Sequence, residues 1–125
     1  MATDVRQRSA DAHRKQVEFA IADIAEFLQE TLGQKLVAYI AGISDPKTVG
    51  QWIKGAQAPR HDAEVRLRTA FQVFHLLQDE ESPHTVRAWM IGMNPQLDDV
   101  SPAEALHEGQ LKDVLVAAKA YISGG

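Results

Sequence analysis

Apolar residues recur at helical spacing along most of the chain, and this pattern predicts an all-α fold. In the first segment four apolar residues follow one another at spacings of four, three and four, namely Val17, Ile21, Ile24 and Leu28. We expect one amphipathic helix over residues 11–32, preceded by a polar, frayed end at residues 1–12 and ended by Gly33. No segment has the alternating pattern of a strand, and no internal repeat is found.

Turn and cap residues divide the rest of the chain into shorter helices. A serine or aspartate followed by proline is a helix start, and it occurs three times, at Ser44-Asp45-Pro46, Ser82-Pro83 and Ser101-Pro102-Ala103-Glu104. Glycine follows three of the apolar segments, and Gly92-Met93-Asn94-Pro95 predicts a turn. Helices are therefore expected at residues 34–41, 46–54, 62–78, 83–90, 102–108 and 110–122.

These elements suggest three parts. Residues 1–32 form a leader helix, residues 33–80 a helix-turn-helix region, and residues 81–125 a C-terminal helical module. The predicted fold class is thus all-α, with a helix-turn-helix core between a leader helix and a C-terminal module.

The helix-turn-helix prediction rests on residue type at each position. Ala38 is small enough for a close helix crossing, Gly42 suits a tight turn, and Ile43, Val49 and Trp52 would face the core. The turn after Gly42 is one residue longer than in the simplest form of the motif. An ordinary helical hairpin, packed only for stability, is the alternative.

The outward residues of the second helix are suited to DNA. They are Lys47, Thr48, Gln51 and Lys54, with Arg60 in the following linker. Gln51 could bond an adenine edge bidentately, whereas Lys47, Lys54 and Arg60 would meet phosphates. Residues 34–75 have net charge +3, between an N-terminal part at −2 and a C-terminal part at −5, although chance clustering could give so small an island. Operator binding would require a dimer.

Composition argues against catalysis and against a membrane. The chain has no cysteine, its five histidines lack zinc-site spacing, and it has neither a phosphate-binding glycine loop nor a nucleophile elbow. We therefore expect no enzyme activity, no catalytic residue, no cofactor and no metal. The start of the chain does not resemble a signal peptide and no apolar run is long enough to span a bilayer, so a cytoplasmic location is expected.

Short motifs in the second half carry a family resemblance. They are Val86-Arg87-Ala88-Trp89-Met90, Asn94-Pro95-Gln96-Leu97, Ser101-Pro102-Ala103-Glu104-Ala105-Leu106, Gly109 and Val114-Leu115-Val116-Ala117-Ala118. Upstream stand Thr48-Val49-Gly50-Gln51-Trp52-Ile53-Lys54-Gly55 and Pro59-Arg60. In this order they resemble the Xre/MbcA/ParS family of antitoxins, over about residues 32–122. One segment differs from the family pattern. Small or glycine-rich residues are common at this place in the family, whereas this chain has Asp98-Asp99-Val100, so the geometry of the turn is open to question.

The resemblance implies a function. Such antitoxins neutralise a RES-domain toxin that degrades NAD, by covering its active site with the C-terminal module, and the helix-turn-helix can repress the shared operon. The expected toxin-binding residues are Lys112, Lys119, Tyr121, Ser123, Gly124 and Gly125. The expected partners are the cognate RES-domain toxin, a second copy of the chain in a homodimer, higher hetero-oligomers with the toxin and, conditionally, operator DNA. Trp89 and Leu106 are expected in the core.

Two other functions remain open. In a stand-alone helix-turn-helix transcription regulator the C-terminal module would only dimerise. A DNA-partition or structural accessory protein is the third reading.

Overall fold

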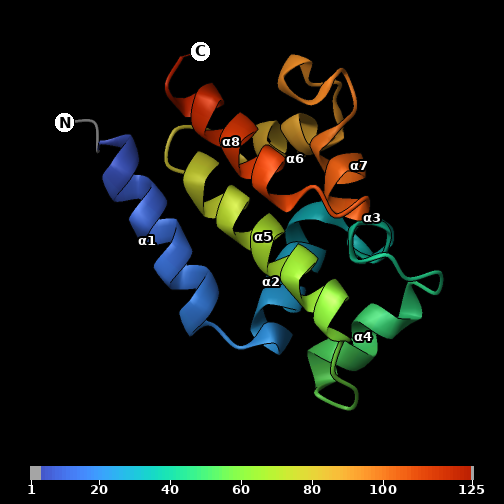
Figure 1. The fold of residues 1–125 in the computed structure, drawn as a ribbon. Helices are drawn as coiled ribbons and strands as arrows, with labels where there is room; N and C mark the ends of the chain where they lie inside the picture. The colour runs from blue at the N-terminus through green and yellow to red at the C-terminus, as the bar shows by residue number, and fades with distance from the viewer. Residues whose placement is uncertain (1–3, 125) are drawn as a thin grey trace.

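The computed structural model describes residues 4–124, and the side chains of all of these except residues 15–18. Within that part the chain is all-α, with eight α-helices, one short 3-10 helix and no strand, as predicted (Figure 1). The elements are α1 (Val5–Glu18), α2 (Ile21–Leu32), α3 (Gln34–Ala41), α4 (Lys47–Lys54), α5 (His61–Leu77), α6 (Pro83–Ile91), η1 (Pro95–Leu97), α7 (Pro102–His107) and α8 (Leu111–Ile122).

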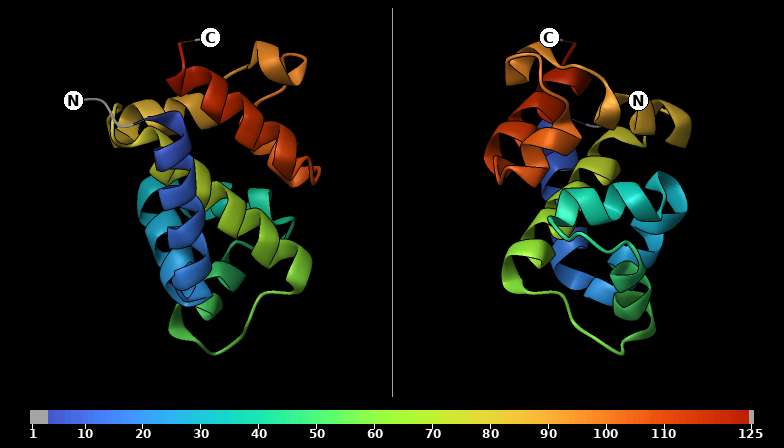
Figure 2. Two further views of the ribbon diagram at one scale, coloured as in Figure 1. Left: turned by 60° about the vertical axis from the view of Figure 1, so that its left-hand side comes forward. Right: turned by 90° about the vertical axis from the view of Figure 1, so that its right-hand side faces the viewer.

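Helix α5 is the element around which the others are arranged. It contacts α1, α2, α3, α7 and α8, and Figures 1 and 2 show it running through the middle of the molecule. Ten of its seventeen residues are buried, among them Leu67, Phe74 and Leu76. One apolar cluster extends from Ala12 on α1 to Ala118 on α8, so helices from all three predicted parts share a core.

The prediction of a single helix over residues 11–32 is wrong. The chain breaks between α1 and α2 at Phe19 and Ala20, where Ala20 has extended backbone angles of φ −65° and ψ 145°. Neither residue is a glycine or a proline, so the break has a tertiary cause. The Phe19 carbonyl accepts a hydrogen bond from Arg68 Nη1 at 2.9 Å, and the Phe19 ring packs edge-on against Phe71 with centroids 5.4 Å apart.

The predicted apolar stripe holds for the second of these two helices. Ile24 and Leu28 are fully buried and Ile21 is partly buried against the core. The side chain of Val17 lies outside the described residues. The prediction of a frayed start is also wrong for most of its length, because α1 begins at Val5; residues 1–3 lie outside the described part.

Most of the predicted helix starts and stops are confirmed. Ser82 Oγ accepts from Thr85 N at 3.2 Å, and Ser101 Oγ accepts from Glu104 N at 3.0 Å, as side-chain N-caps do. Gly42 has left-handed angles (φ 83°), which end α3 at the predicted position. At the start of α4 the boundary differs by one residue, since Pro46 precedes the helix and Asp45 Oδ1 caps Lys47 N.

Four arginines join helices that are far apart in sequence. Each donates a hydrogen bond to a carbonyl at or just beyond the end of another helix, where the last carbonyls lack a partner within the helix. The pairs are Arg8 with Leu76, Arg66 with Leu106, Arg68 with Phe19, and Arg87 with Leu32. Because α1 and α5 run antiparallel, Arg8 bonds to the end of α5 while Arg68 bonds to the end of α1 (Figure 1).

None of the helices in residues 4–124 combines the length and the apolar character that a membrane span requires.

The Arg8 contact can be tested by mutation. Its side chain is 4% exposed, and Nη2 donates to Leu76 O at 2.8 Å while Nη1 contacts Glu80 Oε1 at 2.7 Å. Arg8→Met should lower the free energy of unfolding by about 2 kcal/mol, because hydrogen bonds to charged groups are lost. Urea denaturation followed by circular dichroism measures this.

Arg6→Met, on the exposed side of the same helix, is the matched control and should change the free energy of unfolding by less than about 0.5 kcal/mol. Equal losses in the two variants would show that Arg8 does not hold α1 in place.

Candidate DNA-binding and partner-binding surfaces

Helices α3 and α4 are two short helices joined by the turn at Gly42. Ala38, Val49 and Trp52 are buried, at 2%, 0% and 3% exposure, and Ile43 packs partly buried against the core, all as predicted. Trp52 is therefore a core residue and is not available for stacking on a base. Helix α4 packs against both α2 and α3, and these two contacts fix the orientation of the helix and so the direction of its outer face.

The outer face of α4 carries three of the five candidate DNA-binding residues. Lys47, Gln51 and Lys54 are exposed, and their spacing of four and three residues places them on one side of the helix. None of these three side chains forms an ion pair or hydrogen bond with another described side chain. This face can therefore meet a ligand without first breaking an internal contact.

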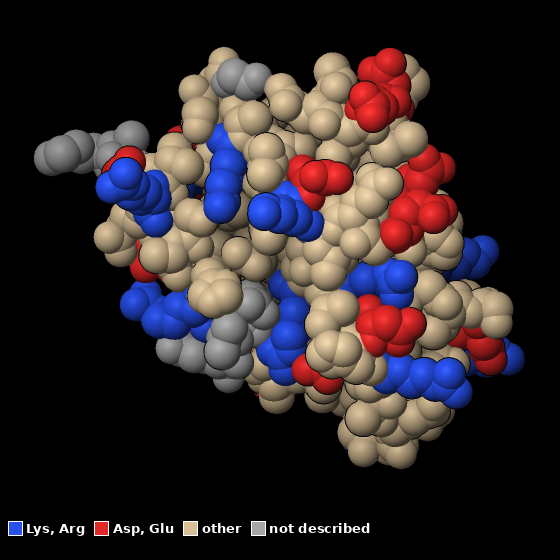
Figure 3. All heavy atoms as spheres, viewed as in Figure 1, with Lys and Arg blue, Asp and Glu red and all other residues tan. Residues whose placement is uncertain are grey.

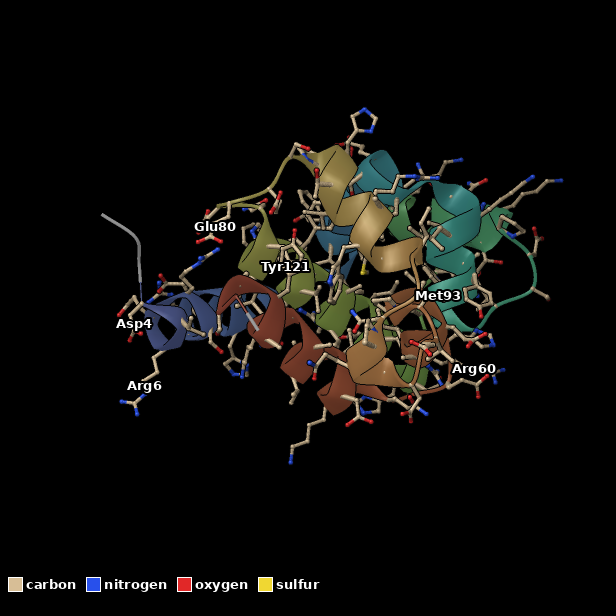
Figure 4. All side chains as sticks on the ribbon, turned by 90° about the horizontal axis from the view of Figure 1, so that it is seen from above. Asp4, Arg6, Arg60, Glu80, Met93 and Tyr121 are labelled. Atoms are coloured by element: carbon tan, nitrogen blue, oxygen red, sulfur yellow. The ribbon has the colours of Figure 1, made fainter. Side chains whose placement is uncertain are left out.

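The other two candidates lie at a neighbouring cavity. Thr48 is half-buried, and it lines a cavity of about 410 Å³ together with Trp52 and with Arg60, which precedes α5. In Figure 4, Arg60 lies at the opposite end of the molecule from Asp4 and Arg6. Thr48 and Arg60 thus share this cavity, which Lys47, Gln51 and Lys54 do not line, and Thr48 is less accessible than predicted.

Fewer basic side chains are available at the surface between residues 34 and 75 than the sequence suggests. Arg66 Nε donates to Leu106 O at 3.0 Å, and Arg68 Nε pairs with Glu64 Oε2 at 2.8 Å. These two of the six basic residues between 34 and 75 are engaged inside the protein. The charge available to phosphate near α4 reduces to Lys47, Lys54 and Arg60, which weakens the electrostatic argument for DNA binding.

In the C-terminal module, Asn94 organises the loop between α6 and α7. Its side-chain oxygen accepts from Gln96 N at 2.9 Å, and its carbonyl accepts from both Leu97 N and Asp99 N at 2.9 Å. Its own N–H donates to Val100 O at 3.2 Å. Asn94 is 7% exposed and Leu97 is 6% exposed, so the Asn-Pro turn of the resemblance is a structural feature that closes this loop on the core.

The backbone conformation explains how Asp98 and Asp99 can stand where the resembled family has small residues. Both residues have positive φ, 55° and 67°, a region that glycine enters more readily than other residues. Aspartate tolerates it better than most, because its short polar side chain can bond locally. The turn geometry that small residues would provide is therefore reached here by two aspartates.

The rest of the module joins the body of the protein through α3 and α5. Leu106 and Val114 are fully buried, and Trp89 is only partly buried, so the prediction of a core role holds for Leu106 and in part for Trp89. The His107 ring stacks on Tyr39 at 4.3 Å between centroids, with Nδ1 at 2.6 Å from the Tyr39 carbonyl oxygen. The outer face of α4 and the surface of the C-terminal module thus belong to helices that share one core.

The candidate toxin-binding residues of α8 do not share a face. Lys112 is exposed, and half-buried Lys119 lines a hollow with Arg6 of α1. They are seven residues apart and lie on one side of the helix, while Tyr121 lies about 200° further round than Lys119. Ser123 and Gly124 are exposed beyond the helix, and Gly125 is outside the described residues.

Tyr121 connects the end of α8 to the acidic segment after α5. Its hydroxyl donates to Glu81 Oε1 at 2.8 Å, and its ring lies edge-on to Trp89. The hydrogen bond to Glu81 raises the pKa of the Tyr121 phenol above 10.0, and loss of solvation and repulsion from Glu81 and Glu80 act in the same direction. The phenol therefore stays protonated and remains a donor at neutral pH, and the bond is lost only as pH rises through this raised pKa.

Sequence reasoning missed a groove on the other side of α8 from its lysines. Its volume is about 340 Å³, and it lies between α8 and the Asn-Pro turn; its lining residues include Trp89, Met93, Pro95, Ala117, Ala120 and Tyr121. One signal in the sequence pointed to it, since Met93 is a large apolar residue in a turn, where polar residues are usual.

Comparison with models of known protein families, with curated proteins and with solved structures finds no match to this chain.

The positive φ of Asp99 leads to a prediction about stability. Asp99→Val should lower the free energy of unfolding by about 1–2 kcal/mol, because a β-branched residue resists positive φ. Asp99→Gly removes the same carboxylate without that penalty and should not destabilise the protein. Thermal and urea denaturation of both variants measure the difference, and equal destabilisation would contradict a left-handed conformation at this position.

Proposed function

We propose that the protein is an antitoxin of a type II toxin-antitoxin system that neutralises a RES-domain, NAD-degrading toxin. The observation that carries the proposal is the assembly of the resemblance residues into one unit. Trp89, Asn94 and Leu106 come from different elements, yet they pack or bond within a single module of α6, η1, α7 and α8. This packing is what the resemblance leads one to expect of these residues.

Charge gives independent support. Residues 76–125 contain eight acidic and three basic residues, and Figure 3 shows acidic side chains gathered on the upper right edge, over the segment between α6 and α8. A cleft that binds the anionic pyrophosphate of NAD is electropositive, through cationic side chains or helix N-termini. An acidic module is complementary to such a cleft, and it would both steer association and exclude the anionic substrate.

The proposal includes a conditional role in autorepression. The outer face of α4, with Lys47, Gln51 and Lys54, would enter the major groove, and Arg60 would meet the backbone. With so few exposed cations, one protomer would bind operator DNA weakly, so DNA binding requires a dimer or the toxin complex. A stand-alone transcription regulator uses this same face, and it is distinguished by having no effect on a toxin.

Co-expression tests the main proposal. The toxin-sized reading frame next to this gene, expressed alone, should stop growth and lower cellular NAD, and expression of this chain should restore both. The two proteins should co-purify as a stable complex. Toxicity that this chain does not relieve would refute the antitoxin proposal.

The DNA role makes a separate prediction, measured by gel shifts on the chain's own promoter at low salt. Gln51→Ala should reduce preference at one base-pair position, at a cost of about 1–3 kcal/mol. Lys54→Ala should instead weaken binding to all sequences and reduce the salt dependence. Absence of any shift with the wild-type protein, alone and with toxin, would rule out operator binding.

A further inference from the structure

The groove beside α8 has exposed apolar residues on both of its walls. Met93 is 78% exposed and Tyr121 is 39% exposed, and both line it. Ala117, Ala120 and Tyr121 form the α8 wall of the groove. Val116, which is 53% exposed, lies one turn from both Lys112 and Lys119, so it belongs to the lysine side of the helix and is outside the groove lining. Figure 4, which looks down on the top of the molecule, shows Met93 and Tyr121 on the groove side.

The walls of the groove are held rigidly. On one side, the Asn94 hydrogen bonds fix the turn that carries Met93 and Pro95. On the other side, Ala117 is 2% exposed at the base of the groove, and Tyr121 is tied to Glu81. A preformed apolar surface loses little side-chain entropy on binding, and this is the property of energetically important protein contacts.

The charges around the groove are of one sign. Among its described lining residues there is no lysine or arginine. Glu81 is bonded to Tyr121, Asp98 and Asp99 follow the turn that forms one wall, and Asp113 lies one turn before Ala117. An occupant that buries Met93 and Tyr121 would therefore meet acidic groups at the rim.

We propose that this groove is the docking surface for the toxin, and that it receives an apolar segment of the toxin flanked by lysine or arginine. The inference rests on the proposed function and adds where and how the partner binds. It also separates α8 into two sides. Met93 and Tyr121 contact the toxin, whereas Lys112 and Lys119, on the other side of α8, do not.

Titration of purified toxin with this chain tests the docking surface, with the dissociation constant measured by calorimetry and the toxin's NAD consumption as the second readout. Met93→Glu and Ala120→Glu should each raise the dissociation constant about 30-fold or more, as at energetically central contacts. Met93 is exposed and Ala120 lines the open groove, so the variants should keep the wild-type circular dichroism spectrum.

Two matched controls accompany them. Ile91→Glu places the same charge on an apolar residue that is 52% exposed and outside the groove lining, and Lys119→Gln changes the opposite side of α8. Both should bind the toxin within about threefold of wild type. The double variant D98N/D99N should bind more weakly and with a reduced dependence on salt, because asparagine keeps the turn while removing the charge.

The outcomes separate the two proposals. If the wild-type chain neither binds nor inhibits the toxin, the proposed function fails and the docking proposal, which names the toxin as occupant, fails with it. If wild type inhibits and the groove variants inhibit equally well, only the docking surface is wrong. Sedimentation could also overturn the docking proposal. A dimeric wild type together with a monomeric Met93→Glu variant would show that a second copy of this chain, and not the toxin, occupies the groove.

Discussion

Hydrogen bonds from arginine side chains to the carbonyls at the ends of distant helices are the interaction on which this arrangement of helices depends. The eight α-helices of residues 4–124 have many ends, and the last carbonyls of each lack a partner in their own helix. A guanidinium has several donors and also complements the negative end of the helix dipole. The four pairs are separated by 40 to 68 residues, so each bond that satisfies a helix end also joins two parts of the fold. The C-terminal module is tied to α5 in this way through Arg66.

Helix starts and stops could be predicted because their causes are local. Ser82 and Ser101 cap the N–H three residues ahead, and Gly42 takes a backbone angle that few other residues accept, so neighbouring letters of the sequence are enough. The break after α1 could not be predicted in the same way. Phe19 and Ala20 have no intrinsic tendency to interrupt a helix, and the bend exists because Arg68 and Phe71 lie opposite them in the folded protein.

The candidate sites were predictable to the same extent, and for the same reason. The outward positions of Lys47, Gln51 and Lys54 follow from helical period alone and are confirmed as exposed. Counting charges along the sequence overestimated the positive charge available at the surface of residues 34–75, because a count cannot show that Arg66 is bonded to a carbonyl of α7. The groove beside α8 also depends on which helix faces the Asn-Pro turn, and a sequence pattern does not contain that information.

The reciprocal bonds between α1 and α5 also set an order of assembly during synthesis. The carbonyl that receives Arg8 belongs to Leu76, so about 68 residues must be added before it exists, which takes roughly 3 to 14 s at ribosomal rates. During that interval α1 is a fourteen-residue helix without its packing partner, a length that is marginal in water. The first helix to be made is thus not fixed until the fifth has been made, and the nascent chain presents its N-terminal segment to proteases and chaperones until α5 is complete.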